Sequence, residues 1–177
     1  AVTELFRAYG RERLANAVFI CGRGNNGGDG FAMARLLHEQ GVATRVFAIG
    51  DPKGAAAAPY EALGNRSSIE TIRETADVAR LAKEFAAAPL IIDALLGTGL
   101  SGDARPLYSE IIRAINISGR PVVSVDIPSG IRDGALPKSV VAVRAERTIT
   151  FSLPKLACFY GAGWDASGLV TRVPIGV

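Results

Sequence analysis

The sequence predicts an α/β protein of the Rossmann-like, doubly wound type, in which a mostly parallel sheet lies between two layers of helices. Short apolar runs alternate with segments whose apolar residues recur at helical spacing, the pattern of strands that are buried on both faces. Several runs end in glycine-rich loops, where such folds bind ligands. The chain of 177 residues shows no repeat and no linker, so we expect a single domain over residues 1–177.

The first part of the chain predicts two strands and the helix between them. Residues 17–21 form an unbroken apolar run that ends at a glycine, which predicts the first strand. Residues 29–40 carry apolar side chains at helical spacing and stop before Gly41, which predicts a helix. Residues 44–49 predict the second strand, which ends in a Gly-Asp-Pro turn.

The next segments are shorter and more polar. Residues 55–63 predict a short helix that ends at Gly64, and residues 68–72 predict an edge strand. Residues 75–87 predict a helix whose charged side chains face outward.

The second half of the chain alternates in the same way. Residues 90–95 are apolar except for one carboxylate and predict a central strand. Residues 106–116 predict a helix with proline in its first turn. The remaining apolar runs predict strands at residues 121–127, 147–151 and 170–174.

Composition excludes several classes of protein. The net charge is +3 and no long run of like charges occurs, so we expect no nucleic-acid partner. No apolar run is long enough for a membrane span, so we expect none. Cys21 and Cys158 lie far apart and His38 is the single histidine, which excludes a zinc site and favours the reducing cytoplasm.

Three loops at the carboxyl ends of predicted strands carry polar residues. They cover residues 22–30, 97–103 and 126–130. Parallel strands end at the same edge of a sheet, and ligands bind where the strand order reverses. We therefore expect the three loops to converge on one site.

The first loop has the GxGxxG spacing at Gly22, Gly24 and Gly27, which lets a helix N-terminus approach a pyrophosphate closely. Asp51, at the end of the second predicted strand, stands about where dinucleotide-binding folds place a carboxylate for the ribose. The alternative is that Asp51 only forms a Gly-Asp-Pro turn, and both interpretations stay open.

The same loop holds side chains that a pure anion site would not favour. Asn25, Asn26 and Asp29 offer amide and carboxylate oxygens, which are ligands for hard cations. Asp29 has two interpretations, as the N-cap of the following helix or as a direct ligand contact.

Two carboxylates interrupt apolar strands. Asp93 lies in a central strand, where it must be paired, hydrated or metal-bound, because an uncompensated buried charge is costly. The alternative is an aspartate that accepts hydrogen bonds from loop amides. Asp126 repeats the pattern in the fifth strand, and Ser129 follows in a Pro-Ser-Gly turn.

Four motifs together resemble a known family. GNNGGDG, DALLGTGLSG, VDIPSG and TITFSLPK are similar, in this order, to motifs of the NAD(P)H-hydrate epimerases, the YjeF amino-terminal domain family. The resemblance runs from about Val18 to Gly176. Residues 131–138 depart from the family, which often has a Thr-Gly stretch there.

The resemblance implies an isomerase that interconverts the R and S epimers of hydrated NADH or NADPH in cofactor repair. It also implies a homodimer and a partner dehydratase, either separate or fused in a longer parent chain. A potassium ion would be held by Asn26, Asp93 and Ser129. The residues implied to contact the hydrated dinucleotide are Asn25, Asn26, Gly27, Gly28, Asp29, Gly97, Thr98, Gly99, Leu100, Ser101, Gly102, Asp103 and Asp126.

Inversion of the hydrated carbon requires proton transfer. Asp126 is our candidate general acid or base, because it ends a strand beside two glycine-rich loops. Lys155 is a candidate second catalytic residue, and the alternative is a surface lysine.

Two other functions stay open on the sequence. The GxGxxG spacing and Asp51 also fit an NAD(P)-dependent oxidoreductase, although no Tyr-x-x-x-Lys set for hydride transfer is present. The second alternative is a non-catalytic binding module of the same fold. The joint presence of Asn26, Asp93, Asp126 and Ser129 argues against such a module.

Overall fold

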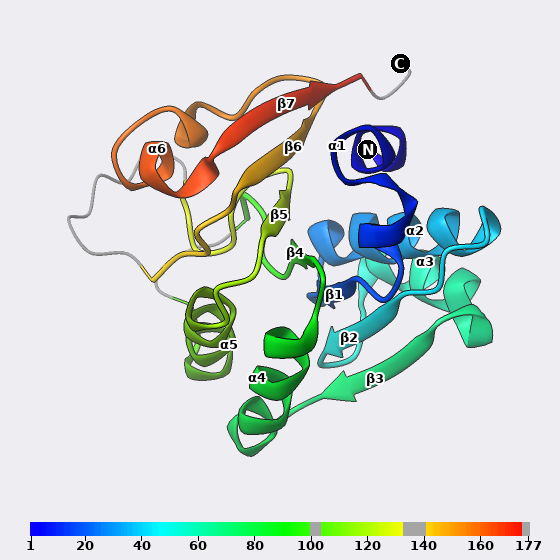
Figure 1. The fold of residues 1–177 in the computed structure, drawn as a ribbon. Helices are drawn as coiled ribbons and strands as arrows, with labels where there is room; N and C mark the ends of the chain where they lie inside the picture. The colour runs from blue at the N-terminus through cyan, green and yellow to red at the C-terminus, as the bar shows by residue number, and fades with distance from the viewer. Residues whose placement is uncertain (100–103, 133–140, 175–177) are drawn as a thin grey trace.

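A computed structural model describes residues 1–99, 104–132 and 141–174. Seven parallel strands form one sheet in the order β3-β2-β1-β4-β5-β6-β7, as Figure 1 shows. Their bounds are β1 Val18–Cys21, β2 Arg45–Ile49, β3 Ser68–Ile72, β4 Ile91–Ala94, β5 Val122–Val125, β6 Arg147–Phe151 and β7 Leu169–Val173. The predicted fold class is confirmed, because helices cover both faces of this sheet.

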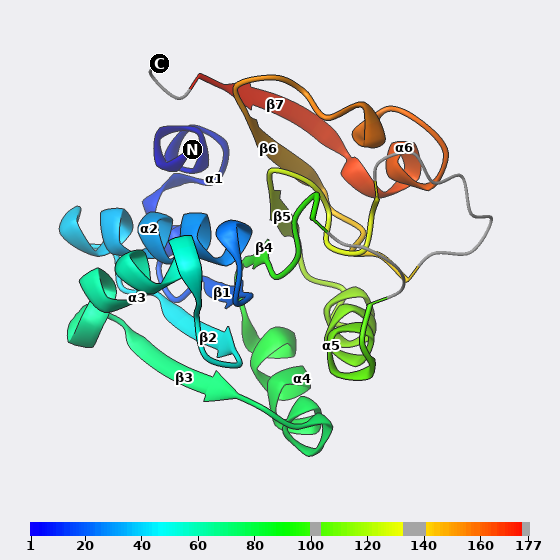
Figure 2. The same cartoon turned by 180° about the vertical axis from the view of Figure 1, so that it is seen from behind.

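Two layers of helices each build a separate core against the sheet. The helices are α1 Val2–Leu14, α2 Asn25–Glu39, α3 Ala57–Leu63, α4 Val78–Ala87, α5 Pro106–Ile117 and α6 Ala162–Ser167. Apolar side chains of α1, α2 and α3 pack on one face of the sheet, and those of α4 and α5 pack on the other. Figure 2 shows the same layers from behind.

The central strand β1 illustrates why its sequence is an unbroken apolar run. Val18 and Ile20 belong to the core under α4 and α5, whereas Phe19 and Cys21 belong to the core under α1, α2 and α3. Successive side chains of a strand point to opposite faces, and here both faces are covered. All four residues are therefore buried.

The order in which strands are added reverses beside β1. The chain first adds β2 and β3 on one side of β1 and then crosses to add β4, β5, β6 and β7 on the other. The carboxyl ends of β1 and β4 therefore border the switch point, where a doubly wound sheet opens a crevice for ligands.

All seven predicted strands are present within two residues of their expected bounds. The helix predicted from residue 29 is corrected, because α2 begins at Asn25 with Gly24 as its N-cap. The helices predicted from residues 55 and 75 each begin with a short 3₁₀ turn, and α1 and α6 were not predicted. Within the described residues, no helix is both long enough and apolar enough to cross a bilayer.

Candidate active site

A cavity of about 760 Å³ opens at the switch point. Its wall is formed by the loop after β1 and the first turns of α2, by the loop after β4, by the start of α5, and by Asp126 after β5. The loops that follow β1, β4 and β5 thus line one site, as their sequence positions predict.

Two glycines allow the strand ends and α2 to come close enough to build this cavity. A Cβ on Gly22 would lie 1.9 Å from the carbonyl oxygen of Leu95, and a Cβ on Gly27 would lie 1.8 Å from the carbonyl oxygen of Gly22. A side chain at Gly22 would push the loop after β1 away from the loop after β4, and one at Gly27 would push α2 away from the end of β1. Because Gly24 caps α2 without a side chain, the first backbone N–H groups of the helix are available to an anion.

Asn26 lies in the wall with one oxygen unused. Its Nδ2 donates to the carbonyl oxygen of Leu96 at 2.9 Å, and its Oδ1 is buried without a hydrogen-bond partner among the described residues. Ser129 Oγ contacts the same Leu96 peptide and accepts a hydrogen bond from its backbone N at 2.8 Å. Asn26 and Ser129, which are distant in sequence, therefore meet around one peptide.

Asp93 is fully buried behind this wall. Its carboxylate accepts hydrogen bonds from Ser124 Oγ at 2.8 Å, from the backbone N of Ser129 at 2.9 Å, and from Ser129 Oγ. Burial raises the pKa of Asp93, while the hydrogen bonds from Ser129, Ser124 and Leu95 oppose that rise. Asp93 thus connects β4 to the loop after β5 through hydrogen bonds. Among the described residues, no positively charged side chain pairs with this carboxylate.

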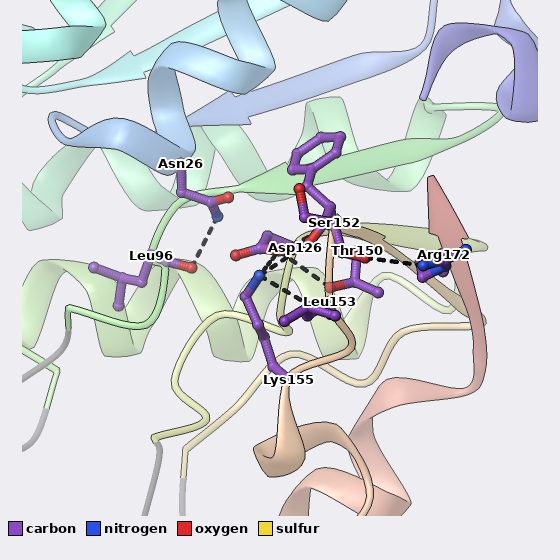
Figure 3. A network of polar contacts seen from close by, with 9 residues as sticks. Asn26, Leu96, Asp126, Thr150, Ser152, Leu153, Lys155 and Arg172 are labelled. Atoms are coloured by element: carbon purple, nitrogen blue, oxygen red, sulfur yellow. Dashed lines mark hydrogen bonds and ion pairs between the residues drawn. The ribbon is translucent and has the colours of Figure 1, made fainter. Parts of the chain in front are cut away.

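Asp126 is the first residue after β5 and reaches the cavity. Its φ of 65° lies in the left-handed region, which aspartate adopts more readily than most residues. Oδ1 of Asp126 forms an ion pair with Lys155 Nζ at 2.9 Å and accepts a hydrogen bond from Thr150 Oγ1 at 3.1 Å. Lys155 Nζ also donates to the carbonyl oxygen of Phe151 at 3.2 Å. Figure 3 shows this pair near Asn26, and Lys155 is therefore held in place rather than free on the surface.

Asp29 faces the same cavity from the second turn of α2. Its interpretation as an N-cap is wrong, because the N-cap is Gly24. The pKa of Asp29 is raised to about 6, mainly by partial burial and also by the nearby carboxylate of Asp126, while Lys155 opposes the rise. The side chain still stays open to the cavity. Two carboxylates and one ammonium group therefore act on one another at this site.

Asp51 does not line the cavity. Its carboxylate forms an ion pair with Arg73 and its side chain is 68% exposed, which agrees with the turn interpretation and not with a ribose contact. Arg23, Arg105 and Tyr108 do line the cavity, and sequence reasoning missed all three. Arg23 occupies a position that the GxGxxG motif leaves open, so its only sequence signal was its place inside the loop.

The structure brings most of the predicted contact residues together. Those on the cavity wall are Asn25, Asn26, Gly27, Asp29, Gly97, Thr98, Gly99 and Asp126. Gly28 instead packs against the 3₁₀ turn Gly54–Ala56 that precedes α3, since a Cβ there would lie 3.1 Å from Ala56 Cα. The remaining predicted contacts lie outside the described residues: Leu100, Ser101, Gly102 and Asp103.

An all-parallel doubly wound sheet with a glycine-lined cavity at its switch point defines the class of α/β proteins that bind a ligand at the carboxyl edge of the sheet. Within this class, the chain belongs to the family described as YjeF-related protein N-terminus, whose family model matches residues 1–157.

Curated relatives agree with this assignment, and a solved structure shares the fold. The chain is 41% identical over 155 residues to a protein named NAD(P)H-hydrate epimerase from Limosilactobacillus reuteri, covering 88% of this chain and 71% of the relative. It is 37% identical over 156 residues to a bifunctional NAD(P)H-hydrate repair enzyme Nnr from Thermofilum pendens, covering 86% of this chain and 30% of the relative. A crystal structure of the yeast protein YNL200c shares the fold, with a TM-score of 0.69 at 22% identity over 98% of this chain and 73% of that chain.

Proposed function

We propose that this protein is an NAD(P)H-hydrate epimerase, an isomerase that interconverts the R and S epimers of hydrated NADH and NADPH. Family membership and the names of the relatives support this activity. The structural observation that carries the proposal is Asp126, held by Lys155 on the wall of a cavity that also presents the N-terminus of α2 to phosphate groups. The cavity volume of about 760 Å³ suits a ligand of this size.

The proposed chemistry is proton transfer at the hydrated carbon of the nicotinamide ring. This carbon bears a hydroxyl beside the ring nitrogen, and inversion opens its bond to oxygen or to nitrogen and closes it from the other face. Either route moves a proton onto the departing atom and off the returning one. Asp126 serves as the general acid and base, a role worth about 10²–10⁴-fold in rate.

Two neighbours support Asp126 in this role. Lys155 fixes the carboxylate through the ion pair at 2.9 Å, and Thr150 Oγ1 donates to the same oxygen at 3.1 Å. Asp29, with a pKa of about 6, is a second carboxyl that can hold a proton near neutral pH. The cavity thus offers proton donors and acceptors from two different loops.

A potassium ion fits the donor set around Leu96. Asn26 Oδ1 is a buried oxygen without a partner among the described residues, Ser129 Oγ contacts the same peptide, and Asp93 adds a buried, uncompensated negative charge. Asn26, Ser129 and Asp93 would hold the ion, and the bound ion would supply positive charge beside the substrate site. We expect a higher thermal unfolding midpoint in potassium chloride than in tetramethylammonium chloride at equal ionic strength. Two results together would contradict this potassium site: the same unfolding midpoint in both salts, and no change of the midpoint in potassium chloride on Asn26→Leu.

The proposal also covers the partners of the protein and its location in the cell. Relatives named as bifunctional repair enzymes support a dehydratase as the functional partner, separate or fused. We also propose a homodimer, since Leu156, Tyr160 and Trp164 form an exposed apolar stretch. A cytoplasmic location agrees with Cys21, which is a free and buried thiol.

Direct measurement of epimerisation tests the proposed activity. The purified R epimer of hydrated NADPH is incubated with the protein, and the ratio of R to S is followed by chromatography beside a protein-free control. We expect conversion well above the spontaneous rate. If the protein bound the dinucleotide but did not accelerate epimerisation, the proposed activity would be wrong and the protein would be a binding module of the same fold.

A further inference from the structure

The residues at the end of β2 indicate how the protein would bind the adenosine half of the substrate. Doubly wound folds that bind NAD place a carboxylate near this strand end for the ribose hydroxyls, whereas those that bind NADP place an arginine nearby for the 2′-phosphate. Here the carboxylate of Asp51 is already bound by Arg73 and lies outside the cavity. Asp51 is therefore not available to a ribose in the cavity.

Arg23 lines the cavity at this strand end. It stands between Gly22 and Gly24 in the loop after β1, and its Nε donates to the carbonyl oxygen of Asp51 at 3.1 Å. The backbone N of Lys53 donates to the carbonyl oxygen of Arg23 at 2.9 Å. These contacts hold Arg23 between the glycine-rich loop and the residues that follow β2.

Gly50 makes room for the arginine stem. Gly50 has a φ of 72°, and a Cβ there would lie 2.9 Å from Cδ of Arg23 and 3.4 Å from its Nε. The stem and Nε are thus held by packing and by Asp51, while no carboxylate among the described residues pairs with the guanidinium. An arginine held in this way presents its two terminal nitrogens as a fork that matches a phosphate group.

We infer that the protein prefers hydrated NADPH to hydrated NADH, because Arg23 binds the 2′-phosphate of the adenosine ribose. The inference rests on the proposed function, which by itself leaves the choice between the two substrates open. The local charge agrees, since Arg73 already pairs with the carboxylate of Asp51, so that the charge of the neighbouring Arg23 is left for a phosphate group. A phosphate group there meets net positive charge, whereas a bare ribose hydroxyl gains nothing from it.

The test measures the dissociation constants of NADP⁺ and NAD⁺ by isothermal titration calorimetry. The proteins compared are the wild type, Arg23→Gln, Arg23→Lys and the control Arg113→Gln, whose arginine lies on the surface of α5 and pairs with Glu110. We expect the wild type to bind NADP⁺ at least about tenfold more tightly than NAD⁺, and Arg23→Gln to weaken NADP⁺ by about 10- to 100-fold. Binding of NAD⁺ by Arg23→Gln should change by less than about threefold, since NAD⁺ lacks the 2′-phosphate.

Three outcomes decide the inference. Equal affinity of the wild type for the two dinucleotides overturns it. Equal weakening of both by Arg23→Gln also overturns it, because that result places Arg23 on the pyrophosphate. Arg23→Lys keeps the charge but loses the Nε anchor, so a preference for NADP⁺ that is smaller than that of the wild type but not lost supports the inference even if Arg23→Gln is unfolded.

The experiment distinguishes a failure of the inferred preference from a failure of the proposed activity, because binding and catalysis are measured separately. The ratio of kcat/KM for hydrated NADPH and hydrated NADH, measured on the same variants, should follow the ratio of affinities. A protein that prefers NADP⁺ through Arg23 but epimerises neither substrate would refute the proposed function and leave the role of Arg23 intact.

Discussion

Asp93 and Asp126 occupy similar sequence contexts, each a carboxylate near the end of an apolar strand, yet the fold gives them different surroundings. Asp93 lies within β4, in register with Ile20 of β1 and Ser124 of β5, and is fully buried. Asp126 lies one residue beyond β5, and its side chain is 17% exposed. Two positions relative to the strand end therefore separate a buried structural carboxylate from one that reaches the ligand cavity.

Their partners differ in the same way. Asp93 is surrounded by neutral donors from its neighbouring strand and loop, whereas Asp126 pairs with the charged Lys155 from beyond β6. Water cannot replace a donor lost beside Asp93, but it can reach Asp126. We therefore expect changes at Asp93 to affect stability first and changes at Asp126 to affect activity first.

Replacement of Asp126 is expected to have the largest effect. Asp126→Asn keeps the size of the side chain and the left-handed backbone, which asparagine also tolerates, but removes the proton-transfer group. We expect kcat/KM for epimerisation to fall about 10²–10⁴-fold, with little change in the urea unfolding midpoint. Asp165→Asn, on the exposed side of α6, is the matched control and should leave both quantities unchanged. Full activity in Asp126→Asn would show that Asp126 is not the general acid or base.

Truncation of Asp93 tests the other half of the comparison. Asp93→Ala leaves the hydroxyl of Ser124 and the backbone N–H of Ser129 without their acceptor in the interior, and Ser129 Oγ keeps only the carbonyl oxygen of Leu96 at 3.2 Å. We expect the free energy of unfolding to fall by about 2–4 kcal/mol, measured by urea denaturation. If the variant were as stable as the wild type, the network between β4 and the loop after β5 would not be a structural element.

The hydroxyls that serve the two carboxylates form a matched pair of smaller changes. Ser124→Ala removes a donor to buried Asp93 and should lower the free energy of unfolding by about 1–3 kcal/mol. Thr150→Val removes a donor to Asp126, which keeps Lys155, so we expect a loss of about 1 kcal/mol or less. The epimerisation rate should fall more in Thr150→Val than in Ser124→Ala. The reverse order in both measurements would reverse the roles assigned to Asp93 and Asp126.

The smallest effect concerns Asp29 and pH. Its pKa of about 6 in the folded protein lies above the ordinary value of 3.8, so ionisation is disfavoured on folding. The stability that Asp29 contributes is fully present below about pH 4 and is lost as the pH rises through about 6. Asp29→Asn should therefore match the wild type near pH 4 and exceed its free energy of unfolding by about 1 kcal/mol at pH 8, since solvent in the cavity screens the full shift. An equal difference at both pH values would exclude titration of Asp29 as the cause.

The strands could be predicted from the sequence because their signal is local. Burial on both faces favours apolar residues at most positions of a central strand, which gives short apolar runs in the sequence such as the one in β1. The helices were harder to predict. α1 is interrupted at Gly10, whose φ is 69°, and α6 has only six residues, so neither shows a sustained helical period.

The start of α2 shows where local preference misleads. Asn25, Gly27 and Gly28 are poor helix formers, so periodicity places the helix start later, at Asp29. The fold requires glycine at Gly22 and Gly27 because backbone atoms of neighbouring segments occupy the space that a side chain would need. Helix α2 therefore begins inside the glycine-rich loop, and Asp29 faces the cavity instead of capping the helix.

The sequence by itself determined the class of fold, the three loops that line the cavity, and the motifs that contain Asp93, Asp126 and Lys155. Hydrophobic periodicity and glycine spacing are properties of one element at a time, so they can be read along the chain. Only the tertiary structure decided that Lys155 pairs with Asp126, that Arg73 binds Asp51, and that Arg23 lines the cavity. Ion pairing and desolvation depend on which loops share a volume, and the strand order around β1 sets that arrangement.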